Sequence, residues 1–518
     1  MKLNYAKTIE KWGIFEVTVS GPKEGNPFCD QWIKGTFCCK NEKKTVDGFY
    51  DGDGVYKVRF MPSFVDEYTL EIEASFDIKE GAAEKCAVRN ILTGSFTVTS
   101  PSADNHGPVR VAGTYYLAYE DGTPYHCIGT TCYVWNLQNE ELQKQTLKTL
   151  EENAFNKIRF CIFPKHYDYN LHEPITYPYE GTPCDSSVLN ENNFAEYNGC
   201  APGNDWDFTR FNPAHFQHIE KCIQALMNLG IEADLIVMHP YDRWGFSMMK
   251  AEDDDRYWKY VLARFSAYRN VWWSLANEYD LMHEKTLSDW ERYASIICKK
   301  DPYHHLRSIH NCKAYYDYNL PWVTHCSIQR TETYRSSELV NEWREKYHKP
   351  VILDEICYEG NIQFGWGNIS GEEMTRRFWE AFCRGGYPGH GETYLSPDRI
   401  LWWSHGGVLH GTSPERIRFL AKIMEETPGL GVEPMPCKWD EVACRAAGFP
   451  ARKDYFIYYY SFMRPGFRDF YFDDTTEYQV EIIDTWEMTI TDGGIHKGKF
   501  RVKLPGKEYM AVRLRVVK

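Results

Sequence analysis

The feature that most constrains the fold is a series of apolar, strand-like runs that alternate with segments of helix length between residues 110 and 432. Eight such runs occur, and they are nearly continuous in apolar residues. Continuous apolar strands are typical of a parallel sheet that is covered on both faces. Eight strand–helix units predict an α/β fold, a closed (β/α)8 or TIM barrel. The runs are 125–135, 156–164, 230–240, 271–278, 306–311, 322–329, 350–360 and 389–394.

An open, doubly wound sheet is the alternative arrangement of such units. It usually carries a Gly-rich phosphate-binding loop after its first strand. Here the first run ends in GTTCYVWN, which lacks that fingerprint, so the barrel is favoured. The clearest helix begins at Pro213 after Asn212 and has apolar residues at helical spacing up to Leu229. Further helices are predicted at 140–153, 251–269, 286–300, 337–347, 371–384 and 413–426.

On both sides of this region, shorter strand-like runs alternate between apolar and polar residues. Residues 1–105 hold runs such as GIFEVTVSG and YTLEIEASF between Gly, Pro and Asp-Gly signals, and they predict an N-terminal β-sandwich. The DGDG stretch at 51–54 lacks the other ligands of a calcium loop and predicts a hairpin turn. After a linker at 427–436, residues 433–518 predict a small C-terminal β-sandwich. The predicted division is thus 1–105, 110–432 as the catalytic barrel, and 433–518.

The overall charge and the aromatic content narrow the class of partner. A formal net charge of −14 and a pI near 5.7 argue against nucleic acid, because phosphate binding needs basic patches. The aromatic fraction of 16% suits a sugar-binding cleft, since the C–H faces of sugars stack on flat rings, although it also suits large cores. Assembly into a homo-oligomer stays open.

The N-terminus and the cysteines predict a cytoplasmic protein. The first residues lack the apolar core of a secretion signal, and no stretch approaches the ~18 apolar residues of a membrane span, so no membrane partner is expected. The 17 cysteines are scattered, many inside apolar runs, which favours reduced thiols over a disulfide framework. No residues stand at the spacing of a metal site, and we expect no metal and no cofactor.

Acidic residues follow two of the runs, where a barrel enzyme places its active site. VWWSLANEYD, 271–280, begins apolar and reaches Asn277 and Glu278, and the seventh run reaches Asp354 and Glu355. Because the carboxyl ends of barrel strands meet at one face, we expect Glu278 and Glu355 to face each other. Such a pair can hydrolyse a glycosidic bond, one protonating the leaving oxygen while the other attacks the anomeric carbon. The alternative is that each Glu solvates a strand end or holds an ion pair.

Other polar residues near the strand ends are candidates for binding the sugar. Arg159 interrupts an apolar strand, where it would keep a carboxylate ionised or form a purely structural ion pair. Several strand ends that bear histidine suggest recognition of hydroxyl groups, and a Trp after the eighth run can lie under a sugar ring. The predicted substrate-binding residues are Arg159, His239, Tyr241, Arg243, Asn277, His310, His325, His390 and Trp402.

The chain resembles the retaining (β/α)8 glycoside hydrolases, particularly the bacterial apiosidase-like glycosidases with an N-terminal β-sandwich and a C-terminal β-domain. The likeness rests on long stretches: YYLAYEDGTPYHCIGTTCYVW, TLEENAFNKIRFCIFPKHYDYNLHEP, HPYDRWGFS, WWSLANEYD, DEICYEGN and GYPGHGETY with LWWSHGGVLHGTSPERI. It implies Glu278 as general acid/base and Glu355 as nucleophile. It also implies supporting roles for Arg159, Asn277, His325 and Trp402.

One departure from the family pattern concerns the loop after the first barrel strand. Apiosidase-like enzymes often carry Gly-Asp-Thr there, where this chain has Gly129, Thr130 and Thr131. The resemblance therefore does not transfer the particular sugar, and a fold alone fixes no substrate.

The predicted function is retaining, double-displacement cleavage of glycosidic bonds in short oligosaccharides or glycosides, as an exo-glycosidase. Asn277 would hydrogen-bond the sugar 2-hydroxyl. One alternative is a non-catalytic carbohydrate-binding or scaffold protein on a glycosidase fold, although decay of a site usually removes a carboxylate and both are present. Another is a barrel lyase or aldolase, which would need a strand-end lysine or a metal triad that we do not find.

Overall fold

The computed structural model describes residues 4–76, 90–166, 174–187, 200–395, 400–436 and 442–517. The chain divides into two compact units. The first unit comprises residues 1–109, 136–138 and 161–307, and the second comprises 110–135, 139–160 and 308–518. Within the described ranges, every helix is too short or too polar to cross a membrane. Part of the family-like stretch KHYDYNLHEP lies outside the described residues.

The central sheet has eight strands: β11 (Gly129–Thr131), β12 (Lys157–Cys161), β15 (Glu232–Met238), β16 (Val271–Ala276), β17 (Arg307–Ser308), β18 (Cys326–Gln329), β19 (Val351–Glu355) and β21 (Tyr387–His390). Their order is β17-β16-β15-β12-β11-β21-β19-β18, which is chain order with the first strand paired to the last. A parallel bridge between His310 and Ser327 joins the ends of this order, after β17 and within β18. The sheet is therefore a nearly closed parallel barrel, which confirms the predicted (β/α)8 fold.

Helices alternate with the barrel strands as the sequence predicts: α2 (Glu140–Glu151), α3 (Pro213–Asn228), α4 (Ala251–Phe265), α5 (Leu287–Lys300), α6 (Val340–Tyr347), α7 (Gly371–Cys383) and α9 (Ser413–Glu425). The start of α3 follows from local chemistry, because the Asn212 side chain accepts the Ala214 N–H and Pro213 occupies the first turn. Helix α3 buries Phe216, Ile219 and Ile223 along one face. The apolar spacing in the sequence thus predicts the face that packs inward.

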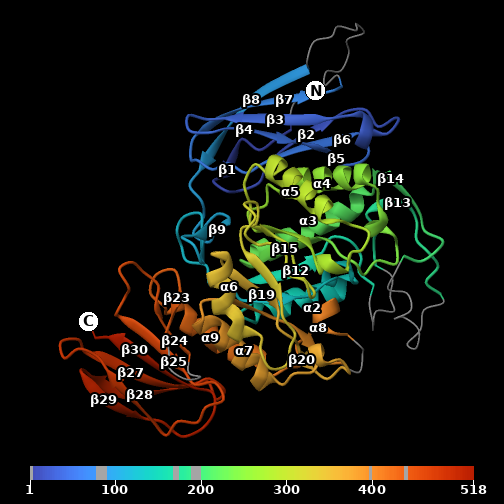
Figure 1. Ribbon diagram of the computed structural model, residues 1–518. Helices are drawn as coiled ribbons and strands as arrows, with labels where there is room; N and C mark the ends of the chain where they lie inside the picture. Colours follow the sequence, from blue (N-terminus) through green and yellow to red (C-terminus); the bar gives the residue numbers. More distant parts are fainter. Residues whose placement is uncertain are drawn as a thin grey trace. The chain divides into compact units, whose positions relative to one another are not determined.

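The N-terminal strands, blue in Figure 1, form two sheets. The strands are β1 (Thr8–Glu10), β2 (Phe15–Ser20), β3 (Ile33–Cys38), β4 (Lys43–Asp47), β5 (Phe49–Tyr50), β6 (Val55–Phe60), β7 (Glu67–Ala74) and β8 (Asn90–Thr99), with a short helix α1 (Pro27–Asp30) between β2 and β3. One sheet has the order β1-β8-β7-β3-β4 and the other β2-β6-β5. The DGDG stretch lies between β5 and β6, which pair antiparallel, so the predicted hairpin is confirmed.

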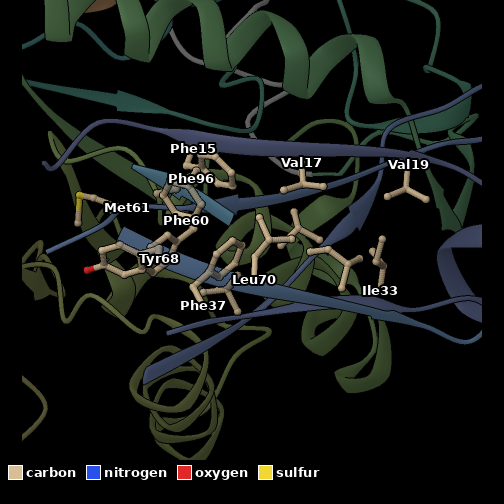
Figure 2. Packing of buried hydrophobic residues seen from close by; sticks show 14 of the residues in the cluster. Phe15, Val17, Val19, Ile33, Phe37, Phe60, Met61, Tyr68, Leu70 and Phe96 are labelled. Carbon is tan, nitrogen blue, oxygen red and sulfur yellow. The ribbon is translucent and has the colours of Figure 1, made fainter. Parts of the chain in front are cut away.

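Aromatic rings from both N-terminal sheets meet in one core (Figure 2). The Phe15 ring stacks on Phe96 with the centroids 3.7 Å apart, and Phe37 stacks on Phe60 at 4.3 Å. Each pair joins a residue of one sheet to a residue of the other, because β2 and β6 belong to one sheet and β3 and β8 to the other. This packing confirms the predicted β-sandwich.

The C-terminal strands are β23 (Val432–Met435), β24 (Val442–Ala446), β25 (Tyr455–Tyr459), β26 (Phe467–Tyr471), β27 (Tyr478–Asp484), β28 (Thr489–His496), β29 (Lys499–Lys503) and β30 (Met510–Val516). Six form a sheet in the order β23-β24-β25-β30-β27-β28, and β26 pairs with β29. The first of these strands lies inside the stretch that the sequence suggested as a linker. That prediction is wrong for Val432–Met435, which pairs antiparallel with β24 although it contains a proline at the sheet edge.

The remaining strands form three small sheets: β9 (Val109–Ala112) with β10 (Tyr116–Tyr119), β13 (Tyr179–Thr182) with β14 (Asp205–Phe211), and β20 (Glu359–Gly360) with β22 (Glu392–Thr393). The last pair follows barrel strands β19 and β21 in the chain and extends them beyond their carboxyl ends.

Candidate active site

Glu278 follows strand β16 and is nearly buried, with 6% of its surface exposed. Its φ angle of 49° lies in the left-handed region, which a non-glycine residue adopts only at a cost in free energy. The hydroxyl of Tyr241 donates a short hydrogen bond to Oε2 of Glu278, and Asn277 Nδ2 donates to the same oxygen over 3.4 Å. The backbone therefore turns sharply at Glu278, and the Glu278 carboxylate accepts hydrogen bonds from two neutral donors.

Lys165, also in the first unit, contacts Tyr241 and acts on the charge of His239. The Nζ atom of Lys165 lies 4.2 Å from the centroid of the Tyr241 ring, a cation–π contact. His239 directly follows strand β15, and its Nε2 lies 3.4 Å from the Phe163 carbonyl oxygen. Burial, followed by the Lys165 charge, lowers the pKa of His239 to about 3, so this imidazole is neutral.

Arg243 lies two residues after Tyr241 but contacts a different segment. Its guanidinium is buried and donates over 3.0 Å to the carbonyl oxygen of Asp185. The carbonyl of Arg243 in turn accepts hydrogen bonds from Ala201 N and Asn204 Nδ2, each over 2.9 Å. Through these hydrogen bonds, Arg243 connects the loop after β15 to Asp185 and to the segment that contains Ala201 and Asn204.

Glu355 is the last residue of strand β19 and is also 6% exposed. Arg159, on β12, donates from Nη1 to Oε1 of Glu355 over 3.3 Å. The Tyr133 hydroxyl donates a short hydrogen bond to the same oxygen, and Nε2 of His310 lies 3.8 Å from it. A guanidinium at this distance favours the ionised carboxylate.

Asp354, the residue before Glu355, shares the cationic surroundings. Lys157 Nζ lies 2.7 Å from its Oδ1, Arg159 Nε lies 3.7 Å from the same atom, and Ser327 Oγ donates to Oδ2 over 2.5 Å. Burial acts to raise the pKa of Asp354, but the charges of Lys157 and Arg159 outweigh it and hold that pKa below its usual range. Arg159 thus bridges two consecutive carboxylates.

A bulge explains how consecutive residues of one strand reach the same cation. Neighbouring side chains of a regular strand point to opposite faces. Between β18 and β19, however, the register advances from Ser327 to Gln329 on one strand and from Ile352 to Glu355 on the other. The extra residue in β19 reorients its end, as bulges near active sites commonly do.

Three predicted residues of the second unit, His325, His390 and Trp402, are buried neutral groups. Burial lowers the pKa of His325 to about 3, and its Nδ1 lies 3.0 Å from Thr324 Oγ1. Burial likewise lowers the pKa of His390 to about 3, and its Nδ1 lies 3.2 Å from Thr130 Oγ1. Trp402 Nε1 donates to the same Thr130 oxygen over 2.9 Å. Thr130, where the chain departs from the family pattern, lies in strand β11 and not in a loop after it, and it connects His390 and Trp402.

Trp403, which the sequence could not separate from Trp402, contacts the aromatic residues beside Glu355. Its ring centroid lies 5.5 Å from Tyr133, 6.0 Å from Tyr358 and 5.1 Å from Trp366. Burial, followed by the Glu355 charge, raises the pKa of Tyr358 well above its usual value. These rings provide flat apolar surface next to the carboxylate.

Sequence reasoning did not identify Tyr133 or the pair of Lys157 and Asp354. Tyr133 lies two residues after β11 but inside the predicted run 125–135, so a tyrosine near the end of that run was the available signal. Lys157 was visible as a second cation in the strand that contains Arg159. Its partner could not be read from the sequence, because it lies on another strand.

Three separate parts of the chain each match a known protein family. Residues 112–426 match the family described as apiosidase-like, catalytic domain. Residues 8–75 match a domain of unknown function, DUF5060, and residues 439–515 match another, DUF5605. No protein with a curated description matches the chain.

Two solved structures from Bacteroides vulgatus ATCC 8482 are similar to this chain. One is a predicted glycoside hydrolase with 38% sequence identity and a TM-score of 0.89, and the match covers 99% of this chain and 100% of the other. The second is a glycoside hydrolase of family 5 with 15% identity and a TM-score of 0.59, over 79% of this chain and 94% of the other. At that identity the second likeness shows the barrel fold alone.

The catalytic-domain match spans more than half of the chain, and the 38% identical relative matches it from end to end. Together with the (β/α)8 fold, these findings give the class of the protein. The chain belongs to the apiosidase-like family of glycoside hydrolases, and it is a glycosidase.

Proposed function

We propose that the protein hydrolyses glycosidic bonds with retention of configuration, with Glu355 as nucleophile and Glu278 as general acid/base. Glu278 follows the fourth barrel strand and Glu355 ends the seventh. Active sites of (β/α)8 enzymes are built at the carboxyl ends of the strands, which is where both residues stand. Family membership supports glycoside hydrolysis, and the position of the two acids supports the mechanism.

The assignment of Glu355 as nucleophile rests on its contact with Arg159. A nucleophilic carboxylate must be ionised when the substrate arrives, and the guanidinium 3.3 Å away favours that form. The Tyr133 hydroxyl fixes the same oxygen by a hydrogen bond. The carboxylate would then attack the anomeric carbon and form the glycosyl–enzyme ester as the leaving oxygen departs.

Glu278 would supply and recover the proton. In the first step its carboxyl group protonates the leaving oxygen, and in the second it takes a proton from the water that attacks the ester. Tyr241 and Asn277 hold its Oε2 and so orient the carboxyl group for this exchange. Asn277 would also hydrogen-bond the sugar 2-hydroxyl, a contact that strengthens in the transition state.

The proposed substrates are short oligosaccharides or glycosides, cleaved from one end. The rings of Trp402 and Trp403 are the candidates to lie under a sugar, and Trp403 contacts Tyr133 beside the proposed nucleophile. The remaining predicted binding residues, Arg243, His239, His325 and His390, are all buried and would act by shaping the pocket wall.

We also propose a cytoplasmic location, which the use of cysteine supports. Thiols such as Cys161 and Cys326 lie buried as free cysteines, as is usual in a reducing compartment. Cell fractionation followed by immunoblotting tests this, and recovery of the protein with exported proteins would contradict it.

A covalent label tests the mechanism directly. A panel of aryl glycosides first identifies the sugar, and NMR of the initial product reads its anomeric configuration. The matching 2-deoxy-2-fluoro glycoside should then inactivate the enzyme, and peptide mass spectrometry should find the sugar on Glu355. A product of inverted configuration, or a label on another residue, would refute the proposal.

A further inference from the structure

A second acidic group lies in the second unit and has no role in the proposed reaction. Glu359 begins β20 and Glu392 begins β22, and the two residues are direct partners in a parallel pair of strands. His390 ends β21, two residues before Glu392. All three are buried, with at most 1% exposed, and one ligand atom of each lies within 4.8 Å of the other two.

The two carboxylates are held by backbone N–H groups of one loop. His410 N and Gly411 N donate to Glu392 over 2.5 and 2.7 Å. Thr412 N and Ser413 N, at the start of helix α9, donate to Glu359 over 2.7 and 3.0 Å. These donors fix the orientation of both carboxylates and favour negative charge, as helix N-termini do.

Backbone dipoles do not supply a full positive charge to this pair. Among the described residues, no lysine or arginine forms an ion pair with Glu359 or Glu392. Two adjacent buried carboxylates can both be ionised only if a cation lies between them; otherwise they share a proton.

The position of Gly411 shows which oxygens of Glu359 and Glu392 lie close to the same point. A Cβ atom on Gly411 would lie 2.5 Å from Oε2 of Glu359 and 2.7 Å from Oε2 of Glu392, closer than real Cβ atoms approach an oxygen. Both Oε2 atoms therefore border the same small space. Glycine lets the loop pass there without filling it.

His390 provides the observation that points to a ligand. Its Nδ1 lies 3.2 Å from Thr130 Oγ1, an oxygen with a second lone pair besides the one that accepts the Trp402 indole N–H. When Nδ1–H donates to Thr130, the lone pair of the neutral ring is on Nε2. That atom is fully buried and has no hydrogen-bond partner among the described residues.

We propose that Glu359, His390 and Glu392 bind one divalent transition-metal ion such as Mn²⁺ or Zn²⁺ through two carboxylate oxygens and an imidazole nitrogen. Imidazole is a ligand of these ions, whereas Ca²⁺ and Mg²⁺ prefer oxygen ligands alone. The backbone donors on the carboxylates and Thr130 on the imidazole are the outer partners that metal ligands usually have. The ion would brace the segments after β19 and β21 against the start of α9.

Binding of Mn²⁺ to the full-length chain tests the proposal, because Mn²⁺ favours nitrogen and oxygen ligands over the many free cysteines of this chain. After treatment with a chelator and desalting, the chain is titrated with Mn²⁺, and the free ion is followed by electron paramagnetic resonance. We expect one bound Mn²⁺ per chain, a rise in Tm, and a ¹⁴N coupling from one imidazole in pulsed spectra.

Variants then assign the site. Glu392→Gln should weaken Mn²⁺ binding at least about 10-fold, and His390→Gln should remove the ¹⁴N coupling. Glu415→Gln is the matched control, because Glu415 lies in the first turn of α9 with its side chain 67% exposed; its binding should equal that of the unmodified chain. If the unmodified chain binds neither Mn²⁺ nor Zn²⁺, or if both site variants bind equally well, the proposal is wrong and the carboxyl pair shares a proton. The unmodified chain decides this point even if a variant fails to fold.

Discussion

Two buried acidic pairs lie in the second unit and differ in what balances their charge. Asp354 and Glu355 lie against the side-chain cations of Lys157 and Arg159, whereas Glu359 and Glu392 accept hydrogen bonds from backbone N–H groups and hydroxyls. The pKa of Asp354 is held below its usual range, but that of Glu392 rises to about 8. Equal burial thus gives opposite shifts, because nearby full charges decide the ionisation of a buried carboxyl group. The first pair suits a permanent anion and the second suits a bound cation or proton.

The largest expected effect comes from removing the proposed nucleophile from the first pair. Glu355→Gln keeps the shape of the side chain but cannot form the ester, so kcat should fall at least about 10⁴-fold. Steady-state kinetics on an aryl glycoside measures this, with circular dichroism to check folding. Glu151→Gln, an exposed position on α2, is the control and should keep full activity. A Glu355→Gln enzyme within 10-fold of the unmodified kcat would remove Glu355 from the mechanism.

Removing Arg159, the cation that contacts both Asp354 and Glu355, should make this pair more like the pair of Glu359 and Glu392. Arg159→Met leaves Glu355 and Asp354 without their shared guanidinium. We expect kcat to fall about 10²- to 10³-fold, the size seen when one preorganised electrostatic partner of a reacting group is lost. Arg159→Lys retains a charge but not the two-pronged geometry, and it should recover only part of the loss. If Arg159→Met changes KM alone, Arg159 binds substrate and does not control the nucleophile.

The other cation should affect stability more than turnover. Lys157 contacts Asp354 at 2.7 Å, and neither side chain is more than 1% exposed. Lys157→Met leaves a buried carboxylate with one cation fewer, so the free energy of unfolding should fall by about 3 kcal/mol. Denaturant unfolding measures this value. The double variant with Asp354→Asn should recover most of the loss, and an additive double variant would show that the two residues do not interact.

Sequence patterns predicted the fold more completely than they predicted the side-chain contacts of Asp354 and Glu355. Continuous apolar runs such as 271–276 and the amphipathic pattern of α3 depend on local spacing, so they identified barrel strands and a helix. The edge strand β23 was missed because the three prolines and two glycines of 427–436 resemble a linker, while its pairing with β24 is tertiary. The domain limits at 105 and 433 stay predictions.

The same contrast holds within the site: residues with a local signal could be predicted from the sequence, whereas contacts between distant segments could not. Glu278, Glu355 and Arg159 were proposed because a charged residue inside or at the end of an apolar run is unusual in itself. The contacts of Asp354 were not, because they depend on the bulge between β18 and β19, and a one-residue shift of register leaves no mark on the strand's composition. The partner of Tyr133 was equally hidden, since it lies on a strand more than 200 residues away.

Tyr133 offers the smallest and most selective change to the first pair. Its hydroxyl donates to the Glu355 oxygen that also receives Arg159, so Tyr133→Phe removes one neutral donor and leaves the cation in place. A hydrogen bond to a charged group contributes about 1.5 kcal/mol or more, which corresponds to a fall in kcat of about 10-fold. Single-turnover kinetics should place this loss in formation of the glycosyl–enzyme. A fall as large as that of Arg159→Met would mean that the phenol, and not the guanidinium, controls the charge of Glu355. An unchanged kcat would mean that the cation alone distinguishes this pair from Glu359 and Glu392.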